Sequence, residues 1–455
     1  MSAALTERRE SPPGPKGNWL TGNLPAFRRD RLGFLTDCAQ TYGDVVAFRL
    51  GPRKMILVNH PDQVEEVLVT NNRHYIKHFA LRLTEKTLGN GLLTSESDFW
   101  RRQRRLAQPA FHRDRVAGHA AVMVAFTERM LETWSSGQVF DVQEAMMRLT
   151  LEIIAKTLFD ADVSGESAGL SAAMETTLRS FTERVNHLIP LPHFLPTPSN
   201  RRLARAVKRL DAIIFEIIAR RRASGEDRGD LLSMLLNAQD ENDGDRMTDR
   251  QLRDEAMTLF MAGHETTANT LTWAWYLLAQ HPETEARLHA ELDQVLGDRA
   301  PTLADLHRLP FTEHVITESL RVHPTVWLLG REAIVPTVVG GYPVPVGTTV
   351  YMSQWVVHRD PRFFDDPESF RPERWQDGLM KRIPRYAYFP FGGGPRICIG
   401  NSFALMESVL LLATIARRFR LGLQPGTKAK LLPTMTLRAD GGIPMELSTR
   451  RSLNS

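Results

Sequence analysis

The sequence predicts a mainly α-helical protein with a small β region, organised as a single domain over residues 1–455. Most segments repeat their apolar residues with a helical period, one such segment at 249–280 is unusually long, and β alternation is confined to short stretches. No Ser/Gly-rich linker, low-complexity tract or internal repeat divides the chain. The polar, Pro-rich residues 1–17 are expected to form a flexible N-terminal tail.

The composition indicates an ordinary globular chain and excludes several classes of function. Hydrophobic residues make up 42% and charged residues 24% of the sequence. The net charge of +4 is too small for a nucleic-acid-binding protein, so a basic surface for an acidic protein partner is expected instead. Two cysteines are too few for a disulfide framework, which indicates a reducing compartment. Because the N-terminus has no apolar run for a signal peptide and no apolar run reaches about 18 residues, we expect a cytoplasmic protein without a membrane span. We also expect a monomer.

The chain begins with short strands. Residues 44–58 alternate apolar and polar side chains and are interrupted by Gly51 and Pro52, which predicts two strands joined by a turn. A helix is expected after Pro61. Residues 73–97 show little periodicity and are therefore expected to form a long loop, and loops of that length are usually functional.

A basic helix is predicted at 99–106. Four arginines fall within residues 101–105, and such a cluster is usually a solvated face. Trp100 and Arg104, however, are four residues apart and share one face of the helix. The two side chains could therefore bind a single anion together.

Helical periodicity continues through the rest of the chain. The predicted helices span residues 115–134, 142–160, 168–187, 201–223, 282–297 and 310–322. An apolar, Pro-rich connector at 189–196 cannot be helical and is interpreted either as a mobile lid or as a packed turn. Short strands are predicted at 333–352 and a last hairpin at 431–447.

The longest helix, at 249–280, is predicted to run through the core. It begins at the capping-box pattern Thr248-Asp249-Arg250-Gln251 and ends before Pro282. Because apolar residues lie on most of its sides, we expect other elements to surround it.

The middle of this helix reads Ala262-Gly263-His264-Glu265-Thr266-Thr267. Thr266 can donate a hydrogen bond to the carbonyl of Ala262, which tends to bend a helix, and the glycine beside it would leave room for a small ligand. A satisfied buried polar pair is the alternative interpretation of Glu265 and Thr266. A zinc protease is excluded, because no second histidine follows His264-Glu265 at the required spacing.

Two charged residues of the helix at 310–322 suit an ion pair. Glu318 and Arg321 are three residues apart, and a pair at this spacing is usually a surface feature of little energetic value. The spacing alone therefore predicts no function.

The stretch 391–400 places Cys398 in a glycine-rich loop. Three glycines precede the cysteine and would let a flat partner approach the main chain, and an apolar helical pattern follows it. Near a helix N-terminus and beside Arg396, the thiol would favour its thiolate form and could bind a metal. A buried thiol beside a turn is the alternative. A dinucleotide fingerprint is excluded, because Ile397 occupies the position of the third glycine.

At this point the sequence resembles a known family, the cytochromes P450. The residues that match its haem-ligand signature are Phe391, Gly392, Gly394, Arg396, Cys398, Gly400 and Ala404. The resemblance implies the single-domain cytochrome P450 fold, with haem b bound through a Cys398 thiolate to its iron.

Three further motifs match the family in the same chain order. Trp100 and Arg104 resemble its Trp-x-x-x-Arg, which binds haem propionates, and Lys77, Arg331 and Arg396 are weaker candidates for that role. Ala262 to Thr267 resembles its oxygen-activation motif, in which Thr266 would steady dioxygen and Glu265 would support proton delivery. Glu318, Arg321 and Arg374 resemble its structural triad, which is buried.

The implied function is a haem-thiolate monooxygenase that inserts one oxygen atom from O2 into a C–H bond of a small hydrophobic substrate. Electrons derived from NAD(P)H would arrive through a separate ferredoxin or flavodoxin with its reductase. A haem-based sensor or an electron-transfer protein would use the same ligand, but neither would need Glu265 and Thr266.

Within the family the sequence looks most like bacterial fatty-acid hydroxylases. Arg53 falls where such enzymes can hold a carboxylate, although Leu57 stands where the best-known relatives have a tyrosine. The residues expected to line the substrate pocket are aliphatic: Leu93, Ala262, Val326 and Leu328. Fatty acids are therefore the first prediction for the substrate, and terpenoids or steroids are the alternative.

Overall fold

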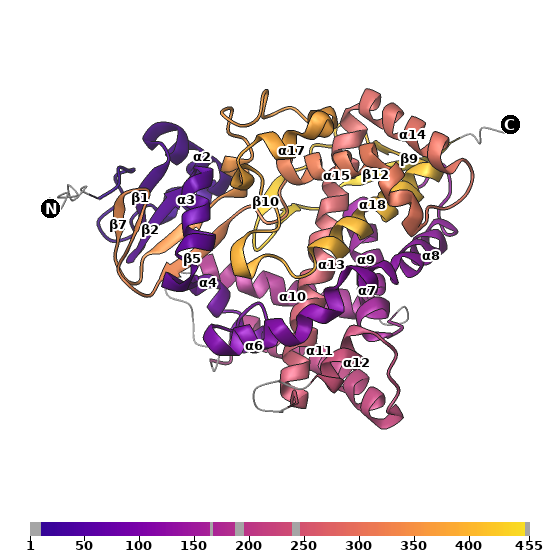
Figure 1. The fold of residues 1–455 in the computed structure, drawn as a ribbon, viewed down its shortest axis with the longest axis horizontal. Helices are drawn as coiled ribbons and strands as arrows, with labels where there is room; N and C mark the ends of the chain where they lie inside the picture. Colours follow the sequence, from indigo (N-terminus) through magenta and orange to yellow (C-terminus); the bar gives the residue numbers. More distant parts are fainter. Residues whose placement is uncertain (1–10, 164–166, 187–194, 239–245, 451–455) are drawn as a thin grey trace, which may run out of the picture. The chain divides into compact units, whose positions relative to one another are not determined.

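The computed structural model describes residues 11–163, 167–186, 195–238 and 246–450. It is mainly helical with small β sheets, as predicted (Figure 1). The described residues form two compact units whose segments alternate along the chain. The first unit takes its residues from Met1–Arg82, Val326–Ser369 and Gly378–Cys398, and the second from Leu83–Thr325, Phe370–Asp377 and Ile399–Ser455. The organisation as a single domain stays a prediction.

The first unit is built on a five-stranded sheet with the order β1-β2-β8-β5-β3. Its strands are β1 (Val45–Leu50), β2 (Arg53–Val58), β3 (Tyr75–Lys77), β5 (Leu329–Ala333) and β8 (Thr349–Met352), with a separate hairpin of β6 (Thr337–Val339) and β7 (Tyr342–Val344). The predicted turn joins β1 to β2, where Gly51 takes a φ of 62°. The β2–β8 pair is parallel and the other neighbours are antiparallel.

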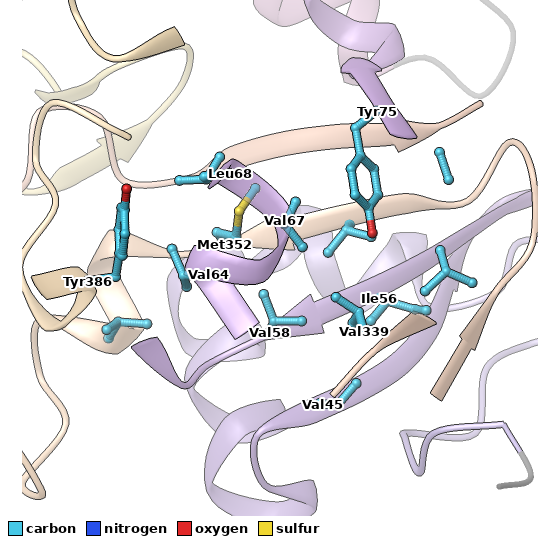
Figure 2. Close-up of a cluster of buried hydrophobic side chains, with 14 of the residues drawn as sticks. Val45, Ile56, Val58, Val64, Val67, Leu68, Tyr75, Val339, Met352 and Tyr386 are labelled. Atoms are coloured by element: carbon cyan, nitrogen blue, oxygen red, sulfur yellow. The ribbon is translucent and has the colours of Figure 1, made fainter. Parts of the chain in front are cut away.

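Short helices accompany this sheet. They are α1 (Leu24–Arg29), α2 (Arg31–Tyr42), α3 (Pro61–Glu65), the π-helical turn η1 (Glu66–Thr70), α4 (Phe79–Arg82), α16 (Gln354–Val357) and α17 (Leu379–Arg382). Figure 2 shows Val64, Val67 and Leu68 of α3 and η1 in a cluster of buried side chains with Val58 of β2 and Met352 of β8. These apolar contacts hold η1 against the sheet.

Two predictions for the first 97 residues need correction. Residues 73–97 are not one loop, because β3, α4 and α5 (Glu85–Leu88) form within them. β3 gains its stability from pairing with β5, which local periodicity does not reveal. Of the predicted tail, residues 1–10 lie outside the described part, while Pro13 accepts a hydrogen bond from the Ala47 amide at 2.8 Å. That end of the tail therefore packs against β1.

The second unit is mainly helical. Its helices are α5, α6 (Ser97–Ala107), α7 (Arg113–Ala117), α8 (Ala120–Leu131), α9 (Val142–Phe159), α10 (Ser167–Asn186), α11 (Pro198–Ser224), α12 (Leu231–Asn237), α13 (Asp249–Gln280), α14 (Pro282–Leu296), α15 (Pro310–Val322) and α18 (Asn401–Arg418). Two small sheets complete it: β4 (Val139–Asp141), β12 (Pro444–Thr449) and β9 (Phe419–Leu423), and the hairpin of β10 (Leu431–Pro433) and β11 (Leu437–Ala439).

Helix α13 is the central element of this unit. Its bounds are those predicted, and the Thr248–Gln251 capping box forms in both directions. The helix packs against α9, α11, α15 and α18 (Figure 1), and most of its side chains are buried. Phe260 stacks on Phe159 of α9 with ring centroids 4.4 Å apart. The core position predicted for this helix is confirmed.

Other predicted elements shift in detail. The helix expected at 115–134 is divided at Gly118 into α7 and α8, and α12 was not predicted. The hairpin expected at 431–447 ends at Ala439, since β12 pairs with β4 and β9 instead. Most of the connector expected at 189–196 lies outside the described residues.

A buried carboxyl group lies in the core of the second unit. Glu407 of α18 is 1% exposed, and burial raises its pKa to about 8, an effect that the nearby Thr267 hydroxyl reduces. An unfolded chain loses this proton near the ordinary glutamate value of about 4.3, so between roughly pH 4.3 and pH 8 the folded state binds one more proton. Glu407 therefore lowers stability as pH rises through this window.

We expect Glu407→Gln to weaken this pH dependence. The free energy of unfolding of the wild type, measured with urea, should decline from pH 5 to pH 8 more steeply than that of the variant. Glu132→Gln, a substitution at an exposed position, serves as the control and should retain the wild-type decline. An equal decline in wild type and Glu407→Gln would contradict the prediction.

Candidate active site

The loop that carries Cys398 has a fixed shape. The Cys398 amide donates to the carbonyl of Phe391 at 3.0 Å, and the Gly392 amide donates to the carbonyl of Phe389 at 2.9 Å. Gly392 and Gly394 have φ values of 71° and 64°, which other residues adopt only at a cost. The loop presents the cysteine side chain as an exposed group, three residues before the start of α18.

Close packing adds a second reason for the glycines. A Cβ atom on Gly394 would lie 1.9 Å from the carbonyl oxygen of Leu68, and one on Gly393 would lie 2.3 Å from the ring of Tyr386. The buried His358 also supports the loop, since its Nε2 accepts a hydrogen bond from the Phe389 amide at 3.0 Å. Sequence reasoning missed His358, because no local pattern distinguishes it.

Two cations of the first unit lie opposite each other on adjacent strands. Lys77 of β3 pairs with Arg331 of β5, and their side chains are 6% and 8% exposed. At the neighbouring His78 the pKa is lowered to about 3, chiefly by burial and then by the charges of Arg331 and Arg82. Like charges in such a cross-strand pair repel, so a bound anion would stabilise them.

The remaining residues predicted in the first unit occupy different settings. Val326, Leu328, Phe391 and Arg396 are half-buried. Arg53 is exposed at the start of β2, and its guanidinium lies over the ring of Phe79, 3.9 Å from the centroid. The cation of Arg53 thus already has an aromatic partner.

In the second unit, Trp100 and Arg104 lie on α6 as predicted. Trp100 is buried and Arg104 is half-buried, whereas Arg101 and Arg105 are exposed. One side of the helix is therefore solvated, and the Trp100 side is packed. Leu93, in the loop before α6, is half-buried.

The centre of α13 has one open face. Ala262 is exposed and Thr266 is partly exposed, although most of the residues around them are buried. The Thr266 hydroxyl donates to the Ala262 carbonyl at 2.7 Å, as predicted, yet the helix continues without a break from Asp249 to Gln280. Gly263 does not leave room for a ligand: a Cβ there would lie 2.6 Å from Cδ1 of Ile154 in α9.

Glu265 is buried and lies on another face of α13. Its Oε1 accepts a hydrogen bond from the Thr436 hydroxyl at 2.7 Å and lies 3.9 Å from Nε of Arg438. Burial raises the pKa of this carboxyl, while Arg438 and Thr436 act in the opposite direction. Sequence reasoning missed both partners, because they come from the β10–β11 hairpin far along the chain.

The predicted triad forms around Glu318. Arg321 donates to both carboxylate oxygens at 2.9 Å, and Nε of Arg374 donates to Oε1 at 2.8 Å. Two further donors complete the site, the indole of Trp375 at 2.8 Å and the backbone amide of Arg371 at 2.9 Å. Glu318 and Arg321 are fully buried.

These arrangements agree with the comparisons to known proteins. A model of the cytochrome P450 family matches residues 12–442. The chain belongs to the cytochrome P450 family. It is a P450 monooxygenase, so the predicted reaction class is confirmed, and the family implies haem iron, O2 and electrons from a redox partner.

Two curated P450 relatives come from Streptomyces melanosporofaciens. Cyclooctatin synthase is 42% identical over 432 residues, which covers 93% of both chains. Cyclooctat-9-en-7-ol 5-monooxygenase is 39% identical over 436 residues, covering 93% of this chain and 94% of its own. The solved haem domain of cytochrome P450DA matches with a TM-score of 0.89 and 28% identity, over 98% of this chain and 99% of its own.

The comparisons do not support the predicted closeness to fatty-acid hydroxylases. They agree better with the alternative, a terpenoid substrate. No helix among the described residues is long and apolar enough to cross a membrane.

The residues present fit a P450 haem. The first unit offers an exposed thiol on a fixed loop and the Lys77–Arg331 pair, which would favour an anionic group. The second unit offers the Trp100 and Arg104 side of α6 and the open face at Ala262 and Thr266. A thiolate, cations and a small-residue face are the groups that a haem with two carboxylates and a gaseous ligand requires.

We expect Gly394→Ala to reduce haem binding. The added methyl group would collide with the Leu68 carbonyl and displace the cysteine loop. The Soret absorbance per mole of purified protein should fall several-fold. Gly297→Ala is the matched control, since Gly297 has a φ of 56° but nothing within 4 Å of the added atom. Equal haem contents in the two variants would refute the role of this contact.

We expect Glu318→Ala to destabilise the protein by about 3–5 kcal/mol, because it strands buried cations. Urea denaturation of the haem-loaded protein measures the loss. Glu368→Ala is the control, since its partner is Arg359 but its side chain is 74% exposed, and it should cost about 0–1 kcal/mol. Similar losses in both variants would show that the carboxylate of Glu318 has no special role.

Proposed function

We propose that this P450 oxidises a terpenoid, converting one C–H bond to C–OH. One oxygen atom of O2 enters the product, and the other leaves as water after two electrons and two protons are taken up. The observation that carries the proposal is the similarity, at about 40% identity over nearly the whole chain, to two enzymes named for cyclooctatin and cyclooctat-9-en-7-ol.

The residues expected to meet the substrate support this proposal. Leu93, Val326 and Leu328 are aliphatic and half-buried, and Ala262 is exposed, so each has surface that an apolar molecule could cover. Arg53, the candidate for binding a carboxylate, stacks on Phe79 and has no tyrosine partner at position 57. The setting of Arg53 therefore gives little support to the binding of a fatty-acid carboxylate.

We propose that Cys398 provides the thiolate ligand of the haem iron, in a loop that begins at Phe391. Lys77, Arg331, Arg396, Trp100 and Arg104 would bind the haem propionates through their cationic and indole N–H groups. Bound haem would supply the activation of dioxygen. The buried triad of Glu318, Arg321 and Arg374 would keep the surrounding backbone fixed.

Thr266 and Glu265 are the proposed proton carriers. Thr266 uses its hydroxyl hydrogen on the Ala262 carbonyl, so its oxygen can still accept a hydrogen bond from a ligand or water on the open face of α13. Glu265 sits in a setting that raises its pKa through burial, so its carboxyl binds a proton more readily than an exposed glutamate does. Protonation of reduced oxygen favours water formation over release of peroxide.

We propose that an acidic ferredoxin or flavodoxin supplies the electrons. Lys381 and Arg382 of α17 and the nearby Arg385 are exposed and belong to the same unit as Cys398. Complementary charge speeds the encounter of such partners, and salt weakens the effect.

We expect Thr266→Ala to uncouple electron consumption from product formation. With its hydroxyl lost, reduced oxygen should leave as hydrogen peroxide, raising the yield of peroxide per NAD(P)H several-fold. Thr272→Ala is the control: Thr272 makes the same type of bond, to the Ala268 carbonyl at 2.7 Å, but is fully buried. An unchanged peroxide yield in Thr266→Ala would remove Thr266 from proton delivery.

We expect a terpenoid to bind more tightly than a fatty acid. Titration with cyclooctat-9-en-7-ol, followed by the Soret shift, should give a Kd at least about tenfold below that of lauric acid. Arg53→Ala should leave both values nearly unchanged. Tighter binding of lauric acid, weakened by Arg53→Ala, would reverse the proposal and restore the fatty-acid hypothesis.

A further inference from the structure

Three consecutive residues of α13 hold the backbone of α5 and of the loop between α5 and α6. Nη2 of Arg253 donates to the carbonyl of Thr87 at 3.2 Å. Asp254 accepts from the Asn90 amide at 2.9 Å, and Glu255 accepts from the Leu92 amide at 3.0 Å. We call Arg253, Asp254 and Glu255 the loop clamp.

Two glycines let the loop come this close. A Cβ on Gly89, which has a φ of 81°, would lie 1.9 Å from Oδ1 of Asp254. A Cβ on Gly91 would lie 2.4 Å from the Thr258 hydroxyl and 2.5 Å from the Asp254 carbonyl. Both glycines lie in the stretch that the sequence predicted to be a long loop, and they fit this stretch against the helix.

The loop is also closed on itself. The Thr94 hydroxyl donates to the carbonyls of Gly89 and Gly91 at 2.6 and 3.2 Å, and the Ser95 amide donates to the Gly91 carbonyl at 2.8 Å. Internal bonds and the clamp together leave the backbone from Thr87 to Ser95 few ways to move. Leu93, half-buried within it, therefore has a fixed position.

A line of residues along α13 leads from the clamp to the open centre of the helix. Asp254, Thr258, Ala262 and Thr266 follow one another at intervals of four, so they form a line that winds around the helix by about 40° at each step. The loop contacts this line at Asp254 and Thr258, and the exposed Ala262 is the next position along it. From Asp254 to Thr266 the helix rises about 18 Å.

Buried charges are an expensive way to hold a loop. Arg253 is 1% and Glu255 is 0% exposed, and removing such groups from water costs free energy that only good hydrogen bonds offset. Apolar packing would hold a loop loosely and in several registers, whereas bonds to successive backbone amides fix one register. The clamp thus suits a loop whose position must be exact at the level of single backbone atoms.

We propose that Asp254 and Glu255 are positioning residues that determine which C–H bond is oxidised, by fixing Leu93 beside the open face of α13. This rests on the proposed function, in that the loop would form one wall of the substrate site. Losing the clamp would let the substrate take several orientations, so the product becomes a mixture.

Hydrogen exchange tests the positioning step without any substrate. In Glu255→Ala the haem-loaded protein should show exchange of the amides in 87–95 at least about tenfold faster than wild type. Glu255→Gln retains an oxygen acceptor for the Leu92 amide and should exchange much more slowly than the alanine variant. Unchanged exchange in Glu255→Ala would overturn the proposal, whatever the enzyme oxidises.

Product analysis tests the specificity step. Wild type, Asp254→Ala, Glu255→Ala and Glu255→Gln are supplied with a surrogate ferredoxin and its reductase, using cyclooctat-9-en-7-ol and lauric acid as parallel probes. The alanine variants should lower the share of the main product at least about threefold with whichever probe is oxidised, and Glu255→Gln should restore it. If only the terpenoid proposal is wrong, the wild type should oxidise lauric acid but not cyclooctat-9-en-7-ol. The alanine variants should then show the same change in product ratio with lauric acid.

Asp305→Ala controls for general loss of stability. Asp305 is 3% exposed and binds Arg299, so Asp305→Ala also removes a buried, hydrogen-bonded carboxylate. The residues that Asp305 is seen to bind lie outside the loop. Its product ratio should match that of wild type. The proposal would be overturned if Asp305→Ala lowered the share of the main product as much as the clamp variants do. It would also be overturned if Glu255→Ala exchanged faster but kept the wild-type product ratio, because the clamp would then be only a structural feature.

Discussion

The carboxylate of Glu318 is the interaction that binds residues 371–375 to helix α15 of the second unit. It is fully buried, and its donors come from α15 itself and from residues 371–375. The chain leaves the first unit after Ser369 and returns to it at Gly378. A buried anion that loses a donor costs free energy, so this one charge keeps residues 370–377 attached to the helical unit.

Helix α13 performs several tasks because its faces differ. One face, through Asp254 and Ala262, binds a loop and then opens to solvent, and another carries Glu265 to the Thr436 hydroxyl. A long helix can do this because successive residues point in directions about 100° apart. Close packing of α13 against α9, which includes Gly263 and Ile154, helps to hold these faces in one orientation.

The sequence predicted the features that nearby residues determine, such as the ends of a helix and the position of a turn. The bounds of α13 were correct because a capping box and Pro282 mark its ends, and the β1–β2 turn was correct because Gly51 marks it. Partners distant in sequence were missed: nothing near Glu265 indicates that Thr436 will bind it. The site residues were proposed from their motif spacing, and the fatty-acid preference was inferred from weaker local likeness, which does not encode the shape of a substrate.

The parallel pairing of β2 with β8 has a consequence for biosynthesis. Strand β2 ends at Val58, but its neighbour begins only at Thr349, so the ribosome must complete most of the chain before the sheet can form. Until then β2 exposes an unpaired apolar edge that can associate with other chains. Because Cys398, the proposed haem ligand, is made later still, haem capture through it would belong to the end of synthesis, and expression at low temperature or with chaperones should favour the folded holoprotein over aggregates.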